Sequence, residues 1–266
     1  MHKRAKSRKI VQTSEMLTRQ RKDYILKILK KNGQVIAKTV SQELGLSEDT
    51  IRRDLRELAS EGRLQRVHGG ALPSSPAVVD FVGRQQLATD AKIAIGRAAA
   101  LMVQPGQVVI LDGGTTTLQL AKHLPRDLQA TVVTHSPTIA VALAEHPTIE
   151  IVLIGGRLFK HSVVAVGAAA VEAIGRIRAD LYFMGVTGIH PEAGLSTGDL
   201  EESHIKRALS ASAAETYVLI SADKLNTASP YVIAGLTEID GIIVEPGVPA
   251  ESLDAYRNAG LAVIRA

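Results

Sequence analysis

Apolar residues in the first quarter of the chain recur every three or four positions, and each such run ends at a glycine. This spacing predicts three amphipathic helices in the segments 19–32, 37–44 and 47–58. Ser47 is a favourable N-cap for the third helix, whose apolar stripe is Ile51, Leu55 and Leu58. Residues 63–71 then alternate and turn, which predicts a small two-stranded wing. The order of these elements is typical of a winged helix-turn-helix.

Beyond residue 90 the pattern changes to buried strands alternating with amphipathic helices. Strands are predicted at 108–111, 131–134, 149–154, 181–184, 217–221, 242–244 and 261–264, with helices at 90–103, 117–123, 137–145, 167–175 and 199–213. Repeated strand–helix units predict a Rossmann-like, mostly parallel α/β sheet covered on both faces. The predicted organisation is a basic arm (1–17), a winged helix-turn-helix domain (18–73), a linker rich in proline and serine at its start (74–90) and an α/β domain (91–266).

Charge divides the chain in the same place. Residues 1–75 hold 17 Lys and Arg against 8 Asp and Glu, whereas the other residues hold 14 against 19. A basic module joined to an acidic one predicts a polyanion-binding domain fused to a different function. The chain has no cysteine, which excludes disulfides, thiolate metal sites and a cysteine nucleophile. Aromatic residues are 3% of the chain, too few for a single-stranded nucleic-acid platform.

Other classes of protein find little support in the sequence. No apolar run is long enough for a membrane span, and no apolar core follows the basic N-terminus as in a secretory signal. The eight histidines lack paired ligand spacing, so we expect neither a metal nor a cofactor. We therefore expect a cytoplasmic protein with no membrane partner.

The third helix is the candidate for reading DNA. A helix of this type places its N-terminal residues toward base edges in the major groove. The candidate contacts there are Ser47, Glu48, Thr50, Arg52 and Arg53, joined by Arg63, Arg66 and His68 on the wing. The alternative is that Arg52, Arg53 and Arg56 only pair with Asp49, Asp54 and Glu57 on the helix surface.

The second domain carries its candidate chemistry at strand ends. Strand 108–111 runs into Asp112-Gly113-Gly114-Thr115-Thr116-Thr117, where glycines and a helix N-terminus offer free N–H groups to an anion. Asp112 would repel a phosphate and suits a sugar hydroxyl instead. Neither the P-loop motif nor the dinucleotide-binding motif is present. The alternative is a tight strand–helix turn without a ligand. Other strand ends carry Thr134-His135-Ser136, Gly155-Gly156 and Gly185, and Lys206 and Lys224 are candidate cations.

Two stretches of the first domain resemble the DeoR family of bacterial transcriptional regulators. These are Thr50-Ile51-Arg52-Arg53-Asp54-Leu55 and Arg66-Val67-His68-Gly69-Gly70-Ala71. The second domain resembles the effector domain of that family at Asp112–Thr116, Thr134–Ser136, Gly155-Gly156, Asp180–Gly185, Glu201–Lys206 and Lys224, and Phe81, Arg84 and Lys92 fit its lead-in. One departure is Ser221-Ala222-Asp223-Lys224, where many relatives have Asp-x-Ser-Lys.

The resemblance implies a fold like that of ribose-5-phosphate isomerase and glucosamine-6-phosphate deaminase, and a phosphorylated sugar as effector. The implied contacts are Asp112, Gly113, Thr115, Thr116, Gly155, Gly156, Gly185, Glu201, Lys206 and Lys224, and the strand-end residues Gly114, Thr134, His135 and Ser136 join them as candidates. We therefore predict a non-enzymatic regulator, a repressor of a carbohydrate-utilisation operon, that binds double-stranded operator DNA as a homodimer or homotetramer. The alternative is a sugar-phosphate isomerase or deaminase in which Glu201 and Lys206 move protons.

Overall fold

The computed structural model describes residues 17–75 and 80–266, which form two compact units that divide after Ser74. Apart from Leu17, the predicted basic arm lies outside the described residues. None of the described helices is long and apolar enough to cross a membrane.

The first unit is a winged helix-turn-helix, as the apolar spacing predicts. Its elements are α1 (Thr18–Asn32), β1 (Val35–Ile36), α2 (Ala37–Leu44), α3 (Glu48–Ser60), β2 (Gln65–Val67) and β3 (Gly70–Leu72). Ile25, Ile51, Leu55 and Leu58 are buried in a core shared by the helices. The wing has one strand more than predicted, because β1 pairs with β3 and the sheet order becomes β1-β3-β2.

Gly70 makes that third strand possible. A Cβ atom at this position would lie 1.8 Å from the carbonyl oxygen of Val35, which is inside any van der Waals contact. Only glycine lets β1 approach β3 this closely.

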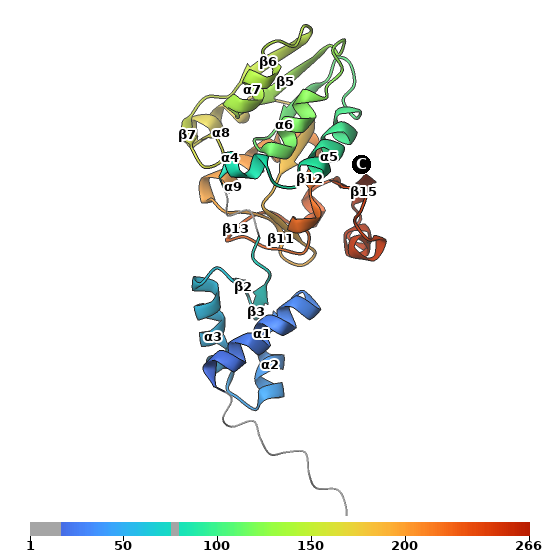
Figure 1. Ribbon diagram of the computed structural model, residues 1–266. Coiled ribbons are helices and arrows are strands. Elements are labelled where there is room, and N and C mark those ends of the chain that lie inside the picture. The colour runs from blue at the N-terminus through green and yellow to red at the C-terminus, as the bar shows by residue number, and fades with distance from the viewer. Residues whose placement is uncertain (1–16, 76–79) are drawn as a thin grey trace, which may run out of the picture. The chain divides into compact units, whose positions relative to one another are not determined.

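The second unit is a parallel α/β sheet with helices on both faces, and Figure 1 shows α5, α6 and α7 side by side. Its first elements are α4 (Phe81–Gln85), α5 (Thr89–Ala100), β4 (Val108–Leu111), α6 (Thr115–Lys122), β5 (Ala130–Thr134), α7 (Pro137–Leu143), β6 (Ile149–Leu153), β7 (Arg157–Phe159), β8 (Val164–Val166), α8 (Ala168–Ile174) and β9 (Ala179–Gly185). The later elements are β10 (Gly188–His190), β11 (Gly194–Thr197), α9 (Leu200–Ala211), β12 (Ala213–Ile220), β13 (Tyr231–Ala234), β14 (Gly241–Val244), α10 (Asp254–Asn258) and β15 (Ala262–Arg265).

Seven strands form the main sheet in the order β15-β14-β12-β9-β4-β5-β6, and every neighbouring pair is parallel. Successive residues enter opposite cores: Leu181 and Phe183 pack with α5 and α6, while Tyr182 and Met184 pack with α8 and α9. The chain adds strands outward from β4 in one direction and then from β9 in the other. The carboxyl ends of β4 and β9 therefore form the switch point where ligands bind in such sheets.

The segment 74–90, predicted as a linker, contains regular structure. It holds α4 and the first residues of α5, and Asp80 caps α4 by accepting a hydrogen bond from the Gly83 amide at 3.0 Å. A five-residue helix is too short to show a periodic apolar pattern. The small antiparallel sheets β7-β8 and β10-β11-β13 escaped prediction for the same reason.

Candidate functional site

The start of α3 is exposed and carries an arginine with no bonded partner. Arg52 forms an ion pair with Glu48 one turn earlier, at 2.9 Å. Arg53 is also exposed, and no hydrogen bond or ion pair joins its side chain to another described residue. Ser47 accepts a hydrogen bond from the Thr50 amide at 3.2 Å, and the two hydroxyls lie 3.0 Å apart. Of the two arginines, Arg53 is the one whose guanidinium is available.

Two carboxylates in the middle of α3 pair with α1 and not with the arginines of their own helix. Asp54 is buried and receives a two-point contact from Arg21, with Nη2 at 2.9 Å from Oδ1. Glu57 pairs with Lys22 at 2.9 Å. None of the pairs weighed as the alternative is therefore found along α3. Arg52 pairs with Glu48 instead, and the Arg21 contact fixes α3 against α1.

The wing candidates are also exposed. Arg66 lies on β2, His68 lies in the turn that Gly69 closes at φ +77°, and Arg63 precedes the wing. Together with α3, the first unit presents all eight predicted DNA contacts without burying any of them fully.

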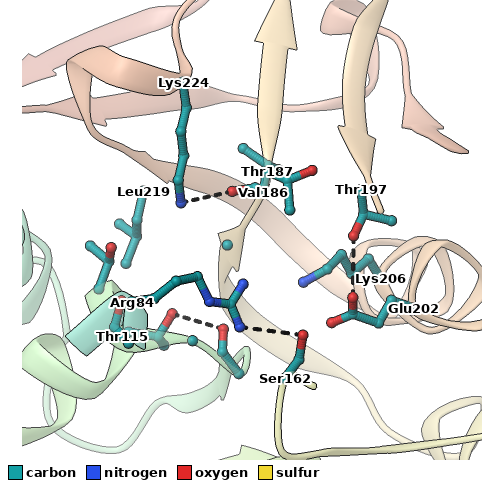
Figure 2. Close-up of a pocket in the computed structure, with 15 residues that line it drawn as sticks. Arg84, Thr115, Ser162, Val186, Thr187, Thr197, Glu202, Lys206, Leu219 and Lys224 are labelled. Atoms are coloured by element: carbon teal, nitrogen blue, oxygen red, sulfur yellow. Dashed lines mark hydrogen bonds between the residues drawn. The ribbon is translucent and has the colours of Figure 1, made fainter. Parts of the chain in front are cut away.

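A polar pocket opens at the switch point of the second unit (Figure 2). It encloses about 490 Å³, counted with its open mouth. The N-terminal turn of α6 lines it, and the N-cap Gly114, at φ +119°, provides no side chain to occupy the first N–H groups of the helix. Such a turn is a favourable place for an anion.

Asp112 lies beneath this turn and is fully buried. Its Oδ1 accepts from the Gly113 amide and from His135 Nε2, each at 2.8 Å, while Oδ2 accepts from the Gly185 amide at 2.8 Å and from Lys206 Nζ. Burial alone would raise the pKa of Asp112, but Lys206 and His135 outweigh it and hold that pKa far below its ordinary value. Both oxygens are occupied, so Asp112 supports the pocket from below.

Both ring nitrogens of His135 have partners. Its Nδ1 lies 2.9 Å from the carbonyl oxygen of Ala165, and its Nε2 lies 2.8 Å from Asp112 Oδ1. These two contacts fix the orientation of the ring beneath the pocket. Asp112, His135 and Lys206 thus form one buried polar cluster.

Two more cations reach the pocket from other elements. Lys224 donates to the Val186 carbonyl at 3.0 Å, and burial lowers its pKa to about 8. Arg84, on α4, donates to Ser162 Oγ at 3.4 Å, while its Nε is buried and has no partner among the described residues. Burial lowers the pKa of Arg84, and the nearby carboxylate of Glu202 raises it by a smaller amount. An arginine nevertheless remains cationic in a protein.

One carboxylate faces these cations. Glu202 on α9 is buried and accepts a hydrogen bond from Thr197 Oγ1 at 3.3 Å, as the dashed line in Figure 2 shows. Thr187 also lines the pocket, with its hydroxyl donating to the Ser196 carbonyl at 3.0 Å. The pocket thus combines an excess of cations with a few acceptors that suit hydroxyl groups.

The structure brings together only part of the predicted effector site. The predicted residues that line the pocket are Gly113, Gly114, Thr115, Thr116, Gly185, Lys206 and Lys224. The predicted residues that do not line it are Asp112, Thr134, His135, Ser136, Gly155, Gly156 and Glu201. Thr117 and Thr187, which lie in the predicted loop and at a predicted strand end, also line it, and the lining residues that sequence reasoning did not assign to the site are Arg84, Ser162, Val186, Thr197, Glu202 and Leu219. Within 17–75 and 80–266, no cluster of potential metal ligands is found.

Two family models match the chain, one in each unit. The DeoR-like helix-turn-helix domain matches residues 21–76, and the DeoR C terminal sensor domain matches residues 87–246. The second match alone spans more than half of the chain.

Known proteins agree with these matches. The HTH-type transcriptional regulator GlpR of Haloferax volcanii is 34% identical over 94% of this chain and 98% of its own. The Glycerol-3-phosphate regulon repressor of Escherichia coli (strain K12) is 28% identical over 90% and 95%. Among solved structures, ribose 5-phosphate isomerase A of Methanocaldococcus jannaschii is similar, with a TM-score of 0.39 and 17% identity over 51% of this chain and 54% of that one. The exposed helix α3, the polar pocket and the two family models point to the same kind of protein. The chain belongs to the DeoR family of transcriptional regulators.

Proposed function

We propose that this regulator represses a carbohydrate-utilisation operon and that a phosphorylated sugar, bound in the switch-point pocket, releases it from operator DNA. The observation that carries the proposal is the convergence of Arg84, Lys206 and Lys224 on the open N-terminal turn of α6. A phosphate monoester is the common metabolite group that such an arrangement binds.

The pocket also favours an ester that bears hydroxyl groups over a bare anion. Glu202, Thr187 and Thr197 line the pocket together with Lys206. A buried carboxylate needs donors, and sugar hydroxyls provide them. One relative is named for glycerol 3-phosphate, a phosphorylated polyol, which agrees with this ligand class.

On DNA, we propose that the N-terminal turn of α3 enters the major groove, with Arg53 on a base edge or a phosphate and the wing residues on the backbone. A dimer would place two such helices on half-sites about 34 Å apart. The effector must then bind the DNA-free form more tightly than the DNA-bound form, by about 1–3 kcal/mol for a coupling of ordinary size.

The test is a titration of the purified protein into the DNA upstream of its own gene, followed by fluorescence anisotropy at one fixed salt concentration. It is repeated with a panel of phosphorylated sugars and with the same sugars unphosphorylated. We expect one phosphorylated compound to weaken binding about 5- to 150-fold, and its unphosphorylated form to have no effect. Specific DNA binding that no compound on the panel changes would contradict the proposed effector class.

A further inference from the structure

We infer that Arg84 binds the anion in the pocket and thereby makes α4 respond to the ligand. The inference rests on the proposed function, because it names a residue through which the same pocket takes its anion. Arg84 lies in residues 77–86, between the two segments that the family models match. Its role follows from the structure and not from those matches.

The guanidinium of Arg84 has unused hydrogen-bonding capacity. In Figure 2 it lies between Lys224 on one side and Ser162 on the other. Its single bond to Ser162 is long, at 3.4 Å, and its Nε is buried without a partner among the described residues. A buried donor without a partner is costly, and an anion in the pocket would satisfy it. Arg84 therefore gains more from an anion than Lys206, which already pairs with Asp112.

The helix that carries Arg84 depends on its surroundings. At five residues, α4 is far shorter than the roughly 12–15 residues that a helix needs to persist alone in water. Three contacts hold it: Phe81 is buried in the core with α5 and α6, the Phe81 amide donates to the His161 carbonyl at 2.9 Å, and Lys92 Nζ donates to the Arg84 and Leu87 carbonyls. An anion held by Arg84 would add a further contact to this small set.

The helix α4 lies close in sequence to the junction between the two units. Only residues 75–80 separate the end of the first unit from α4. Any ligand effect that strengthens α4 therefore acts close in sequence to the point where the chain passes from the DNA-reading unit to the sensor. Arg84 is thus the pocket residue closest in sequence to that connection.

Amide hydrogen exchange of the full-length protein tests this directly, with inorganic phosphate as the probe. Phosphate should slow exchange at the amides of 83–87 and at those of 113–118. We expect about tenfold slowing in α4, the size of one hydrogen bond to a charged group. Arg84→Gln should abolish the slowing in α4 while higher phosphate concentrations still protect 113–118, and Arg84→Lys should restore part of it.

Arg97→Gln is the matched control, because Arg97 is an exposed arginine on the next helix and does not line the pocket. It should respond to phosphate like the unaltered protein. Equal protection of α4 in Arg84→Gln would overturn the inference, and so would protection confined to 113–118 in the unaltered protein. If phosphate and the sugar phosphates protect neither segment, the proposed anion site fails, and this inference fails with it.

Discussion

The two units each bury one aspartate completely, and they use it in different ways. Asp54 in the first unit faces a single arginine, Arg21, in a two-point contact. Asp112 in the second unit faces Lys206 and His135 together with two backbone amides. The first arrangement is electrically balanced, whereas the second lies beside a pocket that holds two further cations, Arg84 and Lys224.

The difference separates a structural ion pair from one that prepares a binding site. A balanced buried pair orients two helices but attracts nothing from solution, because its charges cancel at a distance. In the second unit, Lys206 pairs with the aspartate, and the pocket above it adds two more cations against the single carboxylate of Glu202, so their field adds to the positive end of α6. The first unit accordingly keeps its binding groups on the surface, while the second builds its site upon buried charge.

The largest effect should come from Asp112→Asn. Removing this charge leaves the buried Lys206 without its ionic partner and places an amide NH₂ against existing donors. We expect a loss of about 3–5 kcal/mol in the free energy of unfolding of the second unit, measured by urea denaturation. Asp127→Asn, at an exposed position, is the control and should stay within about 0.5 kcal/mol. A small change in Asp112→Asn would mean that the cluster is not charged as described.

Asp54→Asn should cost the first unit about 3 kcal/mol, because a single buried arginine loses its partner. The balanced pair can be replaced as a unit, so Arg21→Met combined with Asp54→Leu should recover most of that stability. No such apolar replacement should rescue Asp112, whose oxygens also hold the amides of Gly113 and Gly185. Failure of the double variant to recover would show that the Arg21–Asp54 pair does more than hold α3 against α1.

The helix α3 could be predicted from the sequence because the residues that determine it are close together in the chain. Ser47 caps α3, and the spacing of Ile51, Leu55 and Leu58 fixes which face is buried. Exposure of Arg53 follows from that spacing alone. The partner of Asp54 could not be predicted, since Arg21 precedes it by 33 residues and no periodicity connects them.

The pocket was only partly predictable because its walls come from distant segments. The loop after β4 is local, and its glycines and threonines do line the pocket. Glu201 was predicted, but the next residue, Glu202, faces inward, since one position turns a helical side chain by about 100°. Asp112 was predicted to contact the effector. Its contacts with Lys206 and His135, which the sequence does not show, hold it beneath the pocket and out of its lining. Arg84 was noted only as fitting the family's lead-in, and its place in the pocket had no local signal, because its helix is too short to show one.

A smaller effect is expected on the surface of the first unit. Arg53→Ala should weaken specific DNA binding by about 1–3 kcal/mol at fixed salt, without changing stability, because Arg53 is exposed and unpaired in the described structure. Arg52→Ala should cost less, since Glu48 already occupies that guanidinium. Anisotropy titrations of the two variants against unaltered protein provide the comparison. A larger loss in Arg52→Ala would reverse the assignment of the two arginines.

The smallest effect concerns pH and tests whether buried charge governs the pocket. Burial lowers the pKa of Lys224 to about 8, so this lysine is protonated at pH 7 and mostly neutral at pH 9. A bound anion favours the protonated form, so anion affinity should fall with rising pH, by about tenfold between pH 7 and pH 9. Sulfate is the probe for calorimetry, because it is a dianion throughout this range. Lys224→Met should bind sulfate more weakly at pH 7 and lose the pH dependence. An unchanged slope in that variant would assign the titration to another group and leave Lys224 outside the anion site.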